Sequence, residues 1–285
     1  MALLSPRQRT LLRSLWLISA FLGLGWYGAV HIDGVAAMAG RVEAGVLAPA
    51  LACLLAARLL MSLAGWRLLA ANDADPGFWR AWRAYILSQL GRYIPGGFWQ
   101  LLGRHALYRD LGIGGQTAAR LILVETVLLL GVTALLGAGL LLRFAPDGVS
   151  WAERPLLAGL ILTTLVLFTL VLWRWFDTWL TPRMVIVPVL LFLGAFCLFG
   201  LALLLLLGAD LGSLPTTIQV YAAGFLTGSF AVFAPSGIGV REGVVLAALG
   251  NRTPAEAAFA AVILHRFLLI AVDLVLAAIA WLRPG

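Results

Sequence analysis

Seven ionisable side chains lie inside long apolar stretches of the sequence and are the first candidates for chemistry. They are Arg58, Glu125, Arg241, Glu242, His265, Arg266 and Asp273. An unpaired charge inside a bilayer costs about 2.5–3.5 kcal/mol on insertion scales. Each side chain must therefore find a partner, face a wet cavity or bind a ligand, which makes all seven candidate functional residues.

Two glycine- and proline-rich motifs accompany these charges. The first, residues 91–104, reads GRYIPGGFWQLLGR. A helix that begins after the glycines would point its free amides and positive dipole at the turn, between two flanking arginines, and together these groups could bind a phosphate. The alternative is that the arginines extend to the inner membrane interface. The substrate-binding candidates here are Arg92, Gly96, Gly97, Gln100 and Arg104.

The second motif, residues 234–243, reads APSGIGVREG. Adjacent residues of a helix point about 100° apart, so Arg241 and Glu242 are expected to seek separate partners. The alternative places this turn at the outer interface, with both side chains solvated. The substrate-binding candidates from this half are Ser236, Gly237, Gly239, Arg241 and Arg266.

The remaining charges are assigned to pairing or gating. We expect pairs among Glu125, Glu242 and the arginines at 241 and 266. Asp273 lies seven residues after Arg266, two turns along the same helix face, and could pair with Arg58. His265 is either a proton carrier or a packing residue. All these pairs could instead be structural bridges between helices that never contact a substrate.

The composition identifies the setting of these residues. Of 285 residues, 62% are hydrophobic and only 12% are charged, against about 25% in soluble domains. This excludes a soluble enzyme, a disordered chain and a nucleic-acid module, and it predicts an all-α polytopic membrane protein. The net charge is +7, and arginine supplies all 20 of the lysine and arginine residues, because the chain has no lysine. Six segments are predicted to span the membrane: Leu11–Val30, Val46–Ala70, Ala118–Leu142, Pro155–Trp175, Val185–Leu207 and Ala257–Leu282.

Two further apolar segments are broken near their middles. Phe78–Tyr108 and Pro215–Gly250 each carry one of the motifs, and proline and glycine disfavour an unbroken helix there. Each is expected to be a re-entrant hairpin of two half-helices. The alternative is a pair of amphipathic helices on the surface of the bundle. A pair of interrupted segments in corresponding halves is also the sequence sign of a transporter's binding site.

The arginine distribution predicts the orientation. Under the positive-inside rule both termini are cytoplasmic and the protein lies in the cell membrane. The first hairpin then enters from inside and the second from outside. This gives two inverted repeats, about residues 1–142 and 143–285, within one transmembrane domain. A shift of 140 positions places Pro95-Gly96-Gly97 on Pro235-Ser236-Gly237.

The sequence carries no nucleotide-binding loop and no nucleophile–base signature, so we expect no enzyme activity. No cysteine or histidine spacing suggests a metal, and no cofactor or nucleic-acid partner is expected. The oligomeric state is left open.

The two motifs resemble the flippase-like integral membrane family that includes the transmembrane region of lysylphosphatidylglycerol synthases. The resemblance rests on residues 91–104 and Glu125, and above all on the Pro-x-Gly-x-Gly-x-Arg-Glu string at 235–242 with His265-Arg266. It implies a lipid translocator without ATPase parts. The aminoacyltransferase domain of the multidomain relatives is absent from this sequence, so synthesis of a lysyl-lipid is not expected.

The predicted function is therefore movement of a phosphate-bearing headgroup, of a phospholipid, glycolipid or polyprenyl-linked lipid, through a polar cavity between the hairpins. Membrane lipids are the expected partners. The alternatives are a non-transporting accessory subunit or scaffold for a lipid-modifying glycosyltransferase, and a secondary transporter of small solutes.

Overall fold

The computed structural model describes residues 44–94, 98–143, 181–208, 213–231, 237, 239–249 and 255–282, and its regular elements are all helical. In chain order they are α2 (Ala44–Ala70), α3 (Phe78–Gln89), the short 3-10 helix η1 (Leu90–Tyr93), α4 (Trp99–Asp110), α5 (Gly115–Arg143), α7 (Pro182–Leu207), α8 (Leu214–Phe230), α9 (Val240–Leu249) and α10 (Ala255–Leu282).

Four of these helices, α2, α5, α7 and α10, are long and apolar enough to cross a membrane. They coincide with four of the six predicted spans, and their boundaries differ from the prediction by at most three residues. The other two predicted spans, Leu11–Val30 and Pro155–Trp175, lie outside the described residues.

Both interrupted segments form two helices with a break at the motif, as predicted. In the first, η1 continues α3 to Tyr93, and α4 begins at Trp99. In the second, α8 ends at Phe230 and α9 begins at Val240. Gly237 and Gly239 have φ values of 69° and 83°, a left-handed conformation that side chains with a Cβ rarely adopt. Glycine is therefore required where the chain turns into α9.

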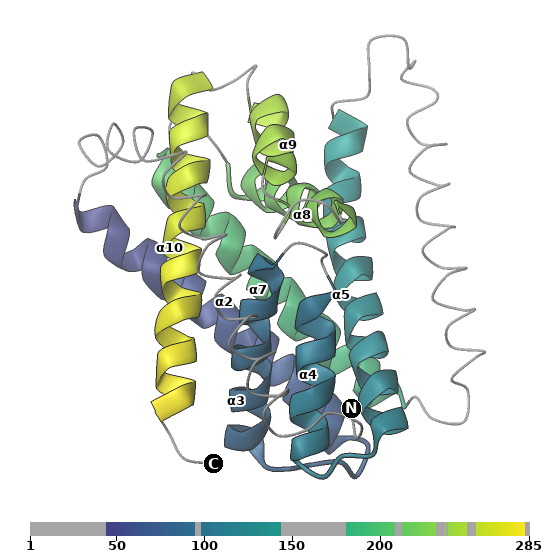
Figure 1. Cartoon of the computed structure of the whole chain (residues 1–285). Helices are drawn as coiled ribbons and strands as arrows, with labels where there is room; N and C mark the ends of the chain where they lie inside the picture. The colour runs from purple at the N-terminus through teal and green to yellow at the C-terminus, as the bar shows by residue number, and fades with distance from the viewer. Residues whose placement is uncertain are drawn as a thin grey trace.

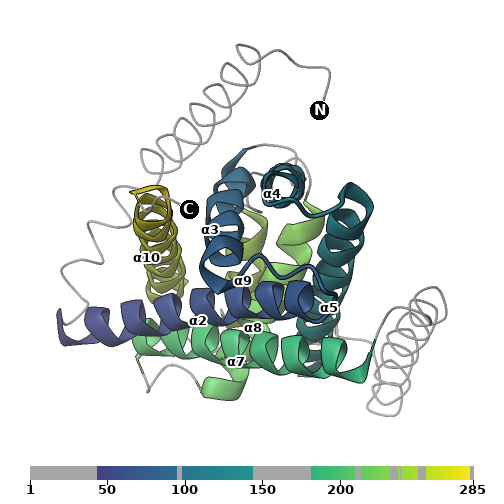
Figure 2. The same cartoon turned by 90° about the horizontal axis from the view of Figure 1, so that it is seen from below.

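The centre of the molecule is the packing of α2 against α7. The buried residues Ala50, Leu54, Ala57, Met61 and Ala64 recur at alternating spacings of four and three along α2. This spacing forms a narrow apolar seam on one helix face. The two helices run antiparallel and side by side, as Figures 1 and 2 show. Phe192, Phe196 and Phe199 of α7 are fully buried beside this seam.

The two pairs of short helices lie between the long helices α5 and α10. In Figure 1, α3 and α4 occupy the lower end of this space, while α8 and α9 occupy the upper end. Close backbone contacts hold each pair in place. A Cβ on Gly91 would lie 2.6 Å from the Gln100 nitrogen, and a Cβ on Gly200 of α7 would lie 2.7 Å from Ile218 Cα. The fold thus brings the two motif-bearing segments toward each other from opposite ends.

Candidate functional site: buried ion pairs at the helix breaks

Ion pairs tie both short-helix pairs to the long helix that follows them. The ion pair at the upper end in Figure 1 joins α9 to α10: Nη1 of Arg266 lies 3.3 Å from Oε1 of Glu242. Both side chains are less than a tenth exposed. The other carboxylate oxygen of Glu242 accepts a hydrogen bond of 2.7 Å from the Gly239 amide. The carboxylate of Glu242 therefore occupies the position at the start of α9 where an anion is favoured.

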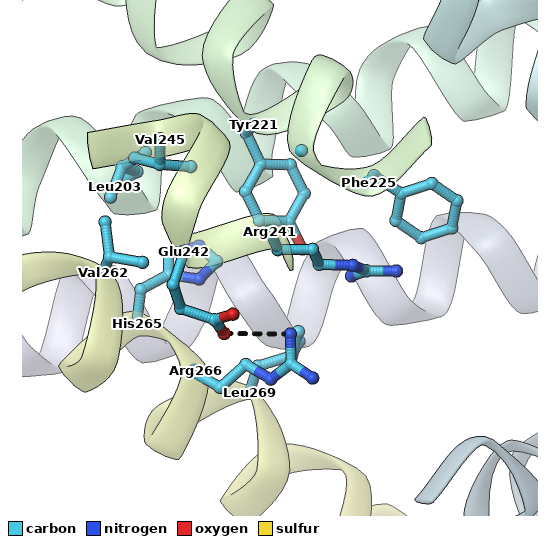
Figure 3. A pocket seen from close by; sticks show the side chains of 11 residues that line it. Leu203, Tyr221, Phe225, Arg241, Glu242, Val245, Val262, His265, Arg266 and Leu269 are labelled. Atoms are coloured by element: carbon cyan, nitrogen blue, oxygen red, sulfur yellow. Dashed lines mark ion pairs between the residues drawn. The ribbon is translucent and has the colours of Figure 1, made fainter. Parts of the chain in front are cut away.

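Arg241 points away from this pair, as expected for adjacent residues of a helix. Figure 3 shows its side chain directed toward Phe225 while Glu242 faces Arg266. Its guanidinium carbon lies 4.3 Å from the centroid of the Phe225 ring, a cation–π contact. Within the described part of the chain, its buried Nε has no hydrogen-bond partner. Gly228 makes room for this side chain, since a Cβ there would lie 2.6 Å from Cγ of Arg241.

A cavity of about 30 Å³, enough for one or two waters, lies between α8, α9 and α10. Its polar lining residues are Tyr221, Arg241, Glu242, His265 and Arg266 (Figure 3). His265 Nε2 lies 3.2 Å from the carbonyl oxygen of Phe199, so this nitrogen is the donor. Its ring also packs on Tyr221, with centroids 5.0 Å apart. These contacts fit the packing alternative for His265.

The ion pair at the lower end in Figure 1 joins α4 to α5. Nη1 of Arg104 lies 2.5 Å from Oε1 of Glu125, and both residues are buried. Nε of Arg104 donates to the Ser88 hydroxyl over 3.1 Å, and the guanidinium lies over the Tyr85 ring at 4.0 Å. The prediction that Glu125 pairs with an arginine of α9 or α10 is therefore wrong. Residues 111–114 join α4 to α5 and turn the chain back, which brings Glu125 beside Arg104.

A third cluster surrounds Asp273 in α10. Arg58 binds it through two contacts, from Nε to Oδ1 at 2.7 Å and from Nη2 to Oδ2 at 2.8 Å. This pairing agrees with the prediction. The Tyr93 hydroxyl donates to Oδ2 over 2.7 Å, and Nη1 of Arg92 lies 3.7 Å from the same oxygen. Arg92 also donates to the side-chain oxygen of Gln89.

The structure thus distributes the predicted site over three clusters rather than one. Arg92 and Arg104, expected to flank one phosphate site, separate: Arg104 is held by Glu125, and Arg92 lies at Asp273. Gln100 is half-buried, and its backbone packs against Gly91. Gly96, Gly97 and Ser236 lie outside the described residues.

Sequence reasoning missed several neutral members of these clusters. The Tyr93 hydroxyl donates a hydrogen bond to Asp273, and the Ser88 hydroxyl accepts one from Arg104. Tyr85, Tyr221 and Phe225 supply aromatic faces. A signal was present in the first segment, because Tyr85, Ser88 and Arg92 recur every three to four residues and therefore share one helix face.

No protein-family model matches this chain, and no curated protein matches it either. The resemblance to the flippase-like family therefore stays a prediction. The described helices indicate a broader class, the α-helical membrane proteins, because four of them are long and apolar enough to cross a membrane.

Proposed function

We propose that this protein is a lipid translocator that moves a phosphate-bearing headgroup between the two leaflets. The observation that carries the proposal is the buried group of Arg241, Glu242 and Arg266 at the break between α8 and α9. Charges in a membrane interior are costly and usually serve a substrate or ion path. Guanidinium groups also match the geometry of phosphate oxygens.

The described conformation is closed. A space of about 30 Å³ holds water but no headgroup, so the Glu242–Arg266 pair must separate for cargo to enter. A phosphate could then take the place of the Glu242 carboxylate beside Arg266, with Arg241 next to it. The acyl tails would remain in the bilayer, so that only the headgroup loses its water.

Two features support an inverted-repeat mechanism. Each half contains a long helix, two short helices and a second long helix, with the long helices beginning at residues 44 and 115 in one half and at 182 and 255 in the other. The short pairs lie at opposite ends of the space between α5 and α10 (Figure 1). In this proposal α3 and α4 form a re-entrant hairpin from the cytoplasmic side, where both termini lie, and α8 and α9 form one from outside.

The test is lipid movement by the purified protein in liposomes. Wild type is expected to move a fluorescently tail-labelled phospholipid, measured by the fraction that dithionite quenches from outside. Arg241→Ala and Glu242→Ala should each lower the rate at least tenfold while the protein stays folded. Arg109→Ala is the matched control, because Arg109 is exposed at the end of α4 and belongs to none of the clusters.

Normal movement by either site variant would refute the proposed site. If folded wild-type protein moves no lipid, the alternative of a non-transporting accessory subunit for a lipid-modifying glycosyltransferase gains support. That alternative predicts instead that the protein is stabilised by its partner enzyme.

A further inference from the structure

The three clusters do not balance in charge. Their arginines are Arg58, Arg92, Arg104, Arg241 and Arg266, and their carboxylates are Glu125, Glu242 and Asp273. Five guanidinium groups and three carboxylates leave a net charge of +2 among these described residues. An uncompensated charge in an apolar interior is unfavourable, and a bound ligand of opposite sign removes that penalty.

The carboxylates are already engaged. Asp273 is held by both nitrogens of the Arg58 fork and by the Tyr93 hydroxyl. Glu125 is held by Arg104, and Glu242 by Arg266 and the Gly239 amide. A ligand ammonium group would have to break one of these contacts to find a negative partner.

The surplus lies on two arginines, one from each short-helix pair. Arg241 contacts an aromatic face in place of a carboxylate, and its Nε has no partner in the described part of the chain. Arg92 is the outermost contact of Asp273, at 3.7 Å, and its side chain is 11% exposed. Both arginines can therefore accept an anion without first losing a strong ion pair.

These two positions lie one above the other along α10. Arg241 lines the same cavity as Arg266 of α10, and Arg92 contacts Asp273, seven residues after Arg266 in that helix. Seven residues correspond to about 10 Å of helix rise. A phosphate with a span of a few ångströms would contact only one of these positions at a time.

We infer that the cargo headgroup carries a net negative charge, and that Arg241 and Arg92 hold its phosphate in turn. The inference rests on the proposed translocator function and adds to it the charge class of the substrate. A zwitterionic headgroup adds no net charge and leaves the surplus of +2 uncompensated, so such lipids are poor cargo.

Binding and transport are measured separately to test this. In detergent, short-chain phosphatidylglycerol, with a net charge of −1, should raise the melting temperature, whereas short-chain phosphatidylcholine, which is zwitterionic, should not. Arg241→Gln and Arg92→Gln should each raise at least fivefold the concentration of phosphatidylglycerol that gives half of this stabilisation. Arg109→Gln should leave that concentration unchanged. Inorganic phosphate should stabilise less than the lipid; the reverse order would overturn a lipid cargo.

In liposomes, tail-labelled phosphatidylglycerol should move at least ten times faster than tail-labelled phosphatidylcholine. Equal binding of both lipids, or binding of neither, would overturn the charge selectivity. Equal transport of both lipids would also overturn it while leaving translocation established. Selective binding without any transport would overturn the translocator function and leave an anionic-lipid site.

Discussion

At the scale of single residues, the Asp273 carboxylate has three side-chain partners. Two arginines and a tyrosine contact its two oxygens, and its side chain is 1% exposed. Removing one partner from such a buried cluster costs more than replacing the whole pair with apolar side chains, because the remaining charge stays buried without compensation.

We therefore expect Asp273→Ala to destabilise the protein by about 3–5 kcal/mol, the range for a broken buried pair. The melting temperature of the detergent-purified protein measures this loss. The double variant Arg58→Met with Asp273→Leu should recover at least half of it, since both charges of the pair are then gone. A single variant as stable as wild type would show that the cluster is reached by solvent.

The sequence predicted some of these pairings and not others for a physical reason. Arg58 and Asp273 were matched because both lie deep in long apolar spans, where each needs a partner of opposite charge. The Arg104–Glu125 pair was missed because its formation depends on how the chain reverses between α4 and α5. Helical period identifies the face on which a side chain lies, but it does not identify the neighbouring element.

At the scale of elements, hydropathy and helix breakers predicted the helices of the described residues to within a few residues. In a bilayer, the backbone of a long apolar run can form hydrogen bonds only with itself and therefore becomes a helix. The spans thus follow directly from the sequence. The breaks follow from proline and glycine. The sequence does not show how closely the two short helices of each pair approach, because the distance depends on backbone contacts such as that of Gly91 with Gln100.

That contact gives a matched pair of variants. A Cβ on Gly91 would meet the backbone of Gln100 at 2.6–2.8 Å, whereas a Cβ on Gly103 would meet nothing within 4 Å. Gly91→Ala should therefore force η1 and α4 apart and lower the melting temperature by several degrees, as overpacking costs about 1–3 kcal/mol. Gly103→Ala should be neutral or raise it, because alanine favours a helix interior by up to about 1 kcal/mol. Equal effects would show that η1 and α4 are loosely packed against each other.

At the scale of the whole molecule, the two ion pairs occupy corresponding places with their signs exchanged. Arg104 lies six residues before the end of α4, and Glu242 lies seven before the end of α9. Their partners, Glu125 and Arg266, lie ten and eleven residues after the starts of α5 and α10. In the proposed inverted repeat these pairs would face opposite leaflets, and each would close the proposed path on its own side.

This arrangement predicts that each pair controls access from one side. The probe is Leu269→Cys, a cavity-lining position, in a background that carries Cys53→Ser and Cys197→Ser. A membrane-impermeant maleimide should label it slowly while both pairs are intact. Glu242→Gln should speed labelling at least fivefold from the outer face only, because it weakens the pair between α9 and α10. Glu125→Gln should instead speed labelling from the cytoplasmic face, measured in inside-out vesicles. If both variants open the same face, the two pairs are not opposing gates.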